Sequence, residues 1–283
     1  GIAFNPNGTK MFVSFQSDFI NEYDLSTPFD ISTHSYAGDS ERCNLANGWS
    51  AEAYDEQPTQ TGDLTFSSDG LHIFIINRGQ SNTDNDALWR YDLTKPFDVS
   101  TCTLAQEKDP DASEALNGWR SGSIEAYHKR HHAQGVTINP DGTKIFISFN
   151  ATRDIAGKSS IREYSLSTPY DISTLTHVDS AGILLTQSNP DSIFFSDNGK
   201  RIFVTDHELY TVTQYSLSIA YDTTSNVKDG AVIIKNFITT KTANQIRALA
   251  FSANGLKMFV SDDNGDDSIH EFDLVCPFNI IEG

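Results

Sequence analysis

The chain has few basic residues, few cysteines and no long apolar run, and each shortage excludes a class of protein. Lys and Arg number 20 against 38 Asp and Glu among 283 residues. A surface this acidic excludes duplex nucleic acid and anionic membranes as natural partners, because both attract basic surfaces. No run of 18 apolar residues occurs, so no transmembrane helix and no membrane insertion are predicted.

The three cysteines are Cys43, Cys102 and Cys276. An odd number cannot form a fully paired framework within one chain. We expect them to be free, or at most one pair to form a disulfide.

Recognisable catalytic motifs are also missing. The sequence contains no Gly-x-Ser-x-Gly, His-Glu-x-x-His, Gly-x-x-x-x-Gly-Lys or Cys-x-x-Cys pattern. No stretch shows the sustained 3.6-residue apolar period of an amphipathic helix. The absence of both features disfavours helical repeats and the commonest hydrolase and nucleotide-binding sites.

The chain does contain one phrase written five times. Its copies are GIAFNPNGTKMFVSF from Gly1, DLTFSSDGLHIFIIN from Asp63, GVTINPDGTKIFISF from Gly135, SIFFSDNGKRIFVTD from Ser192 and ALAFSANGLKMFVSD from Ala248. A second phrase follows each copy, as in NEYDLSTPFDIST from Asn21. The repeats cover approximately residues 1–61, 62–134, 135–190, 191–246 and 247–283. Self-similarity of this length indicates a repeat architecture within a single domain.

Each repeat predicts four antiparallel strands, which in the first copy span 2–4, 10–15, 20–25 and about 35–39. Short runs rich in β-branched and aromatic residues indicate strands. The Asn-Gly or Asp-Gly pair predicts a hairpin turn whose two central residues both have positive φ. Pro28 and its equivalents predict a second turn, since proline cannot donate to a ladder. The predicted fold is therefore all-β: a β-propeller of four-stranded antiparallel blades, with five repeats visible.

The small residues that open each first strand fit the innermost position, where blades converge. The last copy stops after Phe-Asn-Ile and lacks its own fourth strand. We expect the chain to be a piece or a processed product of a longer repeat protein.

The phrases N-P-D-G-T-K-[IM]-F-[IV] and E-Y-D-L-S-T-P-F-D-I-S-T resemble β-propeller repeat proteins of the YVTN and WD40-like group. The resemblance is closest to acidic repeats of marine bacteria and their phages. It covers the core of all five copies and implies architecture rather than a particular activity, since that group includes lactonase-like enzymes, adhesins and scaffolds. No catalytic set of the group is matched here.

Sequence variation concentrates in the loops that join second to third strands and one repeat to the next. We call the edge of the disc that carries these loops the variable rim, and the edge that carries the Asn-Gly and Pro-Phe turns the plain rim. Loops on a rigid scaffold carry most binding residues. The variable rim is therefore the expected functional face.

Two insertions on this rim share an Asn-Gly-Trp followed by Glu-Ala-Tyr. They place Trp49 and Tyr54 in one loop and Trp119 and Tyr127 in the other. These aromatic residues suit stacking on sugar rings or capping an apolar patch of a partner. The alternative is that each tryptophan only anchors a long loop to its blade.

A histidine cluster follows Tyr127, comprising His128, His131 and His132. Three imidazoles so close together suit a transition metal or a polar ligand. Lys129 and Arg130 lie between them and would repel a cation, so a locally basic loop is the alternative.

The acidic loop near the C-terminus offers oxygen ligands from Asp262, Asp263, Asn264 and Asp266. Calcium prefers such ligands, although the EF-hand pattern is absent and turn formation alone explains the composition. The sequence therefore offers calcium as a candidate cofactor. Asp63, Asp191 and Arg247 lie at or just before the first strand of different copies, and we expect them to converge near the channel mouth.

These observations favour a non-enzymatic binding propeller that engages a glycan or protein partner through the variable rim. Such a protein would be extracellular, on a cell surface or on a virion. One alternative is a lactonase-like metal-dependent hydrolase with its site at the channel mouth. The other is an architectural module of a fibre or surface assembly.

Overall fold

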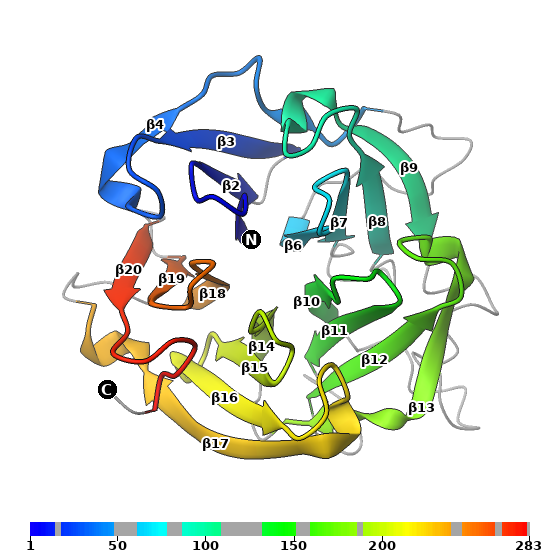
Figure 1. Cartoon of the computed structure of the whole chain (residues 1–283), viewed down its shortest axis with the longest axis vertical. Helices are drawn as coiled ribbons and strands as arrows, with labels where there is room; N and C mark the ends of the chain where they lie inside the picture. The colour runs from blue at the N-terminus through cyan, green and yellow to red at the C-terminus, as the bar shows by residue number, and fades with distance from the viewer. Residues whose placement is uncertain are drawn as a thin grey trace.

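The computed structural model describes residues 1–14, 18–47, 61–77, 87–108, 132–150, 159–185, 189–238, 245–263 and 268–281. These residues form five antiparallel sheets arranged around a common axis (Figure 1). Short 3-10 turns are their only helical elements. The predicted all-β propeller is confirmed.

The sheets follow the sequence repeats, and each meanders outward from the axis. The first blade contains β1 (Ile2–Phe4), β2 (Lys10–Ser14), β3 (Phe19–Leu25) and β4 (His34–Tyr36), with β5 (Cys43–Asn44) also paired to β3. The second contains β6 (Thr61–Phe66), β7 (His72–Asn77), β8 (Ala87–Asp92) and β9 (Thr103–Lys108). The third contains β10 (His132–Ile138), β11 (Lys144–Asn150), β12 (Ser160–Leu166) and β13 (Leu175–Leu184). The fourth contains β14 (Pro190–Phe195), β15 (Arg201–Asp206), β16 (Thr211–Leu217) and β17 (Asn226–Ile233).

The fifth blade has three strands within the described residues, β18 (Ile246–Phe251), β19 (Lys257–Asp262) and β20 (Ile269–Asp273). This agrees with the fourth strand missing from the last repeat. The 3-10 turns are η1 (Ile31–Thr33), η2 (Val99–Thr101), η3 (Ile172–Thr174), η4 (Thr223–Ser225) and η5 (Ile234–Asn236). No helix in the described part of the chain is both long and apolar enough to span a bilayer.

The two repeated phrases form one interlocked turn on the plain rim. In the third blade, Gly142 has φ of 71° and its N–H donates to the carbonyl of Asn139 at 3.0 Å. The ring of Tyr170, itself at φ 62°, covers Gly142 so closely that an added Cβ would lie 2.6 Å from it. Every blade repeats this contact, in the pairs Gly8–Phe29, Gly70–Phe97, Gly142–Tyr170, Gly199–Tyr221 and Gly255–Phe278.

The expected turn with two positive-φ residues is wrong. Only the glycine of each Asn-Gly or Asp-Gly pair has positive φ, and the preceding Asn or Asp does not. The turn is longer than two residues, and in the third blade the N–H of Asn139 donates to the carbonyl of Lys144 at 3.0 Å to close it. Pro140 fits the second position of such a turn, because its fixed φ suits that site.

Polar side chains on several of the third strands join neighbouring blades. Glu163 on β12 accepts hydrogen bonds from the backbone N–H and hydroxyl of Thr223 at 3.2 and 2.8 Å. Glu271 on β20 likewise accepts the N–H of Ile31 at 3.0 Å, which links the fifth blade to the first. The rings of Phe4 and Phe259 also meet across that seam, with centroids 4.5 Å apart. These contacts close the ring at five blades.

A disulfide between Cys43 and Cys102 adds a covalent link between the first and second blades. Cys276 is free. The prediction of at most one pair is confirmed.

Candidate functional site at the channel mouth

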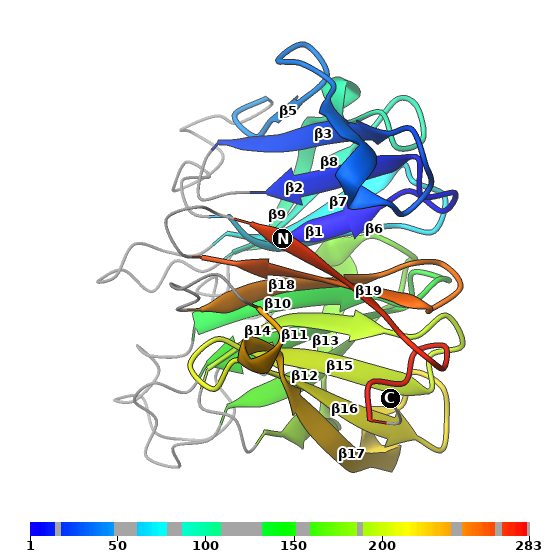
Figure 2. The same ribbon diagram turned by 90° about the vertical axis from the view of Figure 1, so that its left-hand side faces the viewer.

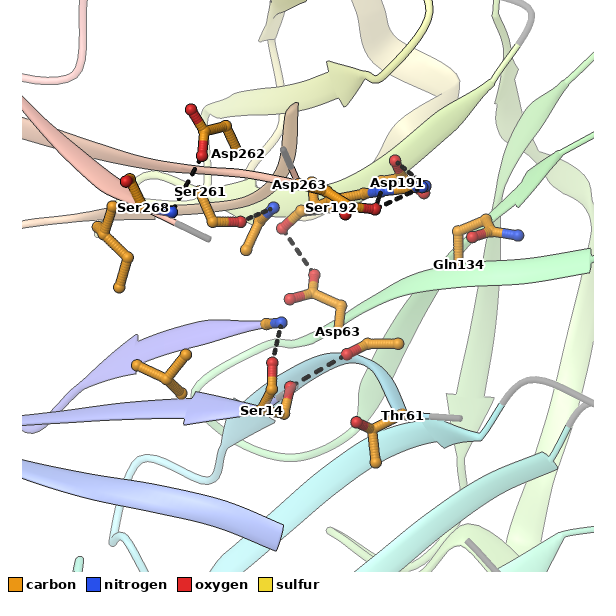
Figure 3. Close-up of a pocket in the computed structure, with 16 residues that line it drawn as sticks. Ser14, Thr61, Asp63, Gln134, Asp191, Ser192, Ser261, Asp262, Asp263 and Ser268 are labelled. Carbon is orange, nitrogen blue, oxygen red and sulfur yellow. Dashed lines mark hydrogen bonds and ion pairs between the residues drawn. The ribbon is translucent and has the colours of Figure 1, made fainter. Parts of the chain in front are cut away.

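A cavity of about 280 Å³ opens where the inner strands begin, on the variable rim (Figure 3). Figure 2 shows the disc from the side, so that the two rims lie at opposite edges of the picture. Its lining comes from all five blades. The polar members are Ser14, Thr61, Asp63, Gln134, Asp191, Ser192, Arg247, Ser261, Asp262, Asp263 and Ser268. Asp63 also lines a second cavity at the plain rim. Asp63 therefore lies between the two cavities.

A local irregularity, repeated four times, points these side chains into the channel. The ladder between the first and second strands shifts register between Thr61 and Leu64, and at the equivalent place in the third, fourth and fifth blades. A bulge leaves residues without a cross-strand partner and re-aims their side chains. The residues at these four bulges are Gly62–Asp63, Gln134–Gly135, Asp191–Ser192 and Arg247–Ala248.

Hydroxyl groups of the second strands satisfy the backbone at these bulges. Ser148 accepts the N–H of Gly135 at 2.8 Å and donates to the carbonyl of Asp191 at 2.7 Å. Thr205 makes the same pair of contacts one blade further on, with Ser192 and with the carbonyl of Arg247. Each hydroxyl therefore fixes its own blade and the next in place. The cavity has a rigid, hydrogen-bonded wall.

Asp63 bridges the channel from the second blade to the fourth. Its Oδ2 accepts the Ser192 hydroxyl at 2.7 Å (Figure 3). Its Oδ1 accepts the N–H of Leu64 at 3.0 Å. The blade between them presents Gly135, where an added Cβ would lie 2.1 Å from the carbonyl oxygen of Asp191. The close approach of the blades thus depends on the absence of a side chain at residue 135.

The environment of Asp63 brings the pKa of its carboxyl close to neutral pH. Its side chain is 6% exposed. Burial raises the pKa of this carboxyl to about 6, and the hydrogen bond from Ser192 opposes that rise. A carboxyl with a pKa near neutrality can both accept and return a proton.

Arg247 organises the adjacent part of the wall. Its guanidinium donates to Asp191 at 3.3 Å and to Asp263 at 3.1 and 3.2 Å. The Nδ1 of His207 lies 2.7 Å from the same carboxylate oxygen of Asp191. Asp191 and Arg247 therefore converge with Asp63 at the mouth, as expected from their place in the repeats.

Gln134 carries an unsatisfied acceptor in this wall. Its side chain is 6% exposed and lines the cavity (Figure 3). Its Oε1 is buried and accepts no hydrogen bond from any described residue. Sequence analysis missed Gln134, although aligning the residue before each first strand would have grouped it with Asp191 and Arg247.

The predicted ligand-binding residues are mostly untested. Trp49, Tyr54, Trp119, Tyr127, His128 and His131 lie outside the described residues. His132 opens β10 opposite Asn150, and the position of its side chain is not described. Whether the aromatic residues and histidines contact a ligand stays a prediction.

Two of the four predicted calcium ligands are described, and both have protein partners. Asp262 accepts the N–H of Ser268 at 3.0 Å and lies 2.9 Å from Nε2 of His270. Asp263 is bound by Arg247. Asn264 and Asp266 lie outside the described residues. Calcium binding at this loop stays a prediction.

Comparisons with known proteins identify the fold. No family model matches the chain, and no curated protein matches it in sequence. Among solved structures, the periplasmic gluconolactonase of Pseudomonas aeruginosa is similar over 96% of this chain and 67% of its own, at 16% identity and a TM-score of 0.53. A protein from Lactobacillus plantarum is similar over 82% of this chain at 13% identity and a TM-score of 0.50, and this chain spans only 55% of it.

A putative 6-phosphogluconolactonase of Bacteroides uniformis is also similar, with 13% identity, coverage of 100% of this chain and 68% of its own, and a TM-score of 0.49. At these identities the likeness shows a shared propeller fold. The predicted non-enzymatic binding propeller is nevertheless contradicted, because the solved structures of this shape include a lactone-cleaving enzyme.

Proposed function

We propose that the chain is a lactonase-like hydrolase whose site is the channel-mouth cavity, with Asp63 as general base. The observation that carries this proposal is a buried carboxyl, with its pKa raised to about 6, at the floor of an open polar cavity. A general base is most effective when its pKa lies near the working pH. The likeness to a gluconolactonase supports the same reaction class.

Lactone hydrolysis needs one proton to move in each of two steps. Water adds to the ring carbonyl and loses a proton to the Asp63 carboxylate. The carbon–oxygen bond of the ring then breaks, and the protonated Asp63 returns the proton to the departing ring oxygen. The product is an open hydroxy acid, and Asp63 is again ionised.

Neighbouring groups support these steps. The Ser192 hydroxyl, 2.7 Å from Oδ2, orients the carboxylate of Asp63. Arg247, fixed by Asp191 and Asp263, brings positive charge into the wall.

A metal is not assigned to this site. Among the described residues, no three His, Cys, Asp or Glu side chains are grouped so that they could hold an ion. The carboxylates of Asp191, Asp262 and Asp263 are instead paired with Arg247, His207 and His270. In the proposed reaction, protein side chains therefore supply the proton transfers.

The proposal also covers the compartment in which the protein acts and its relation to YVTN-type repeat proteins. The Cys43–Cys102 disulfide fits an oxidising compartment, and the similar protein of P. aeruginosa is periplasmic by its name. We therefore propose a secreted or periplasmic site of action, and display on a cell surface or virion as its narrower form. Kinship with the YVTN-type repeats rests on the repeated phrases alone.

The experiment is a proton-release assay with glucono-1,5-lactone, corrected for spontaneous hydrolysis. We expect hydrolysis by the unaltered chain and a loss of about 100-fold or more in Asp63→Asn, as is typical for removal of a general base. Asp24→Asn, an exposed aspartate on β3, is the matched control and should keep full activity. Activity in Asp63→Asn equal to that of the control, or no activity in the unaltered chain, would contradict the proposal.

A further inference from the structure

We infer that the cavity binds an uncharged, polyhydroxylated ring, and that Gln134 holds it by accepting a hydrogen bond from a ring hydroxyl. This inference rests on the proposed function only in that the bound ring is then hydrolysed. The inference itself concerns recognition. It rests on the charge of the wall and on the unpaired oxygen of Gln134.

The charges in the wall disfavour an anionic ligand. The lining side chains carry four carboxylates, from Asp63, Asp191, Asp262 and Asp263, against one guanidinium in the described wall, from Arg247. Arg247 is already engaged by Asp191, Asp263 and Gln245. A phosphate group would therefore meet a surplus of negative charge without a guanidinium free to bind it on two sides.

Gln134 supplies the attractive contact. A buried acceptor without a partner costs stability, and a donor that reaches it removes that cost. Its Oε1 is in this state in the free protein. Gln134 lies at the bulge beside Gly135 and lines the cavity, and a turn of its amide toward the cavity exposes the buried Oε1 to a ligand. Because the nearby carboxylates are acceptors too, the complementary ligand is one that presents several hydroxyl donors.

The negative charges of the wall also favour release of the product of lactone hydrolysis. A neutral ring enters without repulsion, whereas its hydrolysis product carries a carboxylate. Like charges repel the product from an acidic mouth. The wall thus favours entry of the substrate and exit of the product.

The test measures binding separately from catalysis. The ligand is gluconolactam, in which N–H replaces the ring oxygen so that the ring keeps its hydroxyls and resists hydrolysis, and binding is measured by calorimetry. We expect Gln134→Met to weaken binding at least about fivefold, the effect of one neutral hydrogen bond. Its melting temperature should stay unchanged or rise, because the substitution removes an unsatisfied buried oxygen.

Gln106→Met is the matched control. Gln106 bonds Asp171 at 2.8 Å and Ile172 at 3.1 Å at a seam between blades, away from the cavity. This variant should lose stability and keep its affinity. The opposite pattern in the two variants identifies ligand contact, since a general packing defect would lower both stability and affinity in Gln134→Met.

The charge of the ligand is tested with the 6-phosphate of the same lactam. We expect it to bind at least about tenfold more weakly than the neutral lactam at low salt, with a smaller difference at high salt because salt screens repulsion. Equal or tighter binding of the phosphate, unchanged affinity in Gln134→Met, or no binding of the neutral lactam would overturn the inference. Binding that depends on Gln134 without any lactone hydrolysis would support the inference and remove the hydrolase proposal alone.

Discussion

At Asp63, burial of a carboxyl that must ionise to work lowers the stability of the folded chain. The pKa of this group is about 6 in the folded protein against an ordinary value of 3.8. The folded state therefore binds the proton more tightly than the unfolded state. The stabilising contribution of the protonated group is full below about pH 4 and is lost as the pH rises through 6.

Asp63→Asn should consequently stabilise the protein at neutral pH while it removes activity. The pKa difference corresponds to about 3 kcal/mol of unfolding free energy at pH 8, an upper limit because the site can relax. Urea denaturation at pH 8 and pH 4 measures it. We expect a gain at pH 8 and almost none at pH 4, and a loss of stability at pH 8 would show that the carboxylate is not destabilising there.

Ser192 provides a second test at the residue scale. Its hydroxyl donates to Asp63 and lowers the pKa of that carboxyl, against the effect of burial. Ser192→Ala removes the donor, so the pKa of Asp63 should rise further. The acidic limb of the pH–rate profile should then move to higher pH. An unmoved limb would mean that the profile reports another group.

At the scale of elements, the five interlocked turns account for the most uniform residues of the repeat. Gly142 combines positive φ with a ring that leaves no room for a Cβ. Gly38 also has positive φ, at 112°, but an added Cβ would meet nothing within 4 Å. The two positions separate the backbone cost of a substitution from the cost of displacing the ring.

Gly142→Ala should therefore destabilise the protein more than Gly38→Ala. The left-handed conformation costs alanine roughly 1–2 kcal/mol at either site. At Gly142 the displaced Tyr170 ring adds a further penalty, in the range of about 1–3 kcal/mol found for overpacking. Thermal unfolding of both variants measures the difference. Equal losses would show that the ring moves aside without cost.

The strands were predictable because the repeat displays them five times. The first strand of the first blade, at 2–4, was placed as it is found, and the next two strands differ by one residue at one end. The turn type was not predictable from the Asn-Gly pair, because Pro140 and the covering Tyr170 select a longer turn. The bulges were not predictable either, since Gln134 and Gly135 read as a continuation of a regular strand.

At the scale of the whole molecule, the disulfide and the seam between first and fifth blades hold a ring built from local units. Cys43 and Cys102 are separated by 59 residues in sequence. A cross-link that closes a loop of this length stabilises a protein by about 4 kcal/mol in the chain-entropy treatment.

Reduction of the disulfide, or Cys43→Ser with Cys102→Ser, should therefore lower the melting temperature clearly. Cys276→Ser should leave it unchanged, because Cys276 is a free thiol. Calorimetry with and without reductant measures both effects. A reductant effect that persists in the double variant would point to another cause.

Convergence of distant residues at the channel mouth followed from the repeat. Asp63, Asp191 and Arg247 occupy matching positions in different blades, so radial symmetry brings them together. The raised pKa of Asp63 could not be predicted in this way, because it depends on the burial of the carboxyl in the packed channel, which outweighs the opposing hydrogen bond from Ser192. The identity of the ligand contact at Gln134 likewise needs the packed structure.

The central claim is that Asp63, acting at the mouth of a five-bladed ring, is the base of a lactone hydrolase. The pH dependence of kcat/KM for glucono-1,5-lactone, measured from about pH 4.5 to about pH 8, tests it most directly. The account predicts a rate that rises about tenfold per pH unit below a midpoint near 6, then levels off, with no such limb in Asp63→Asn. A flat profile through pH 6, or the same profile in the variant, would contradict it.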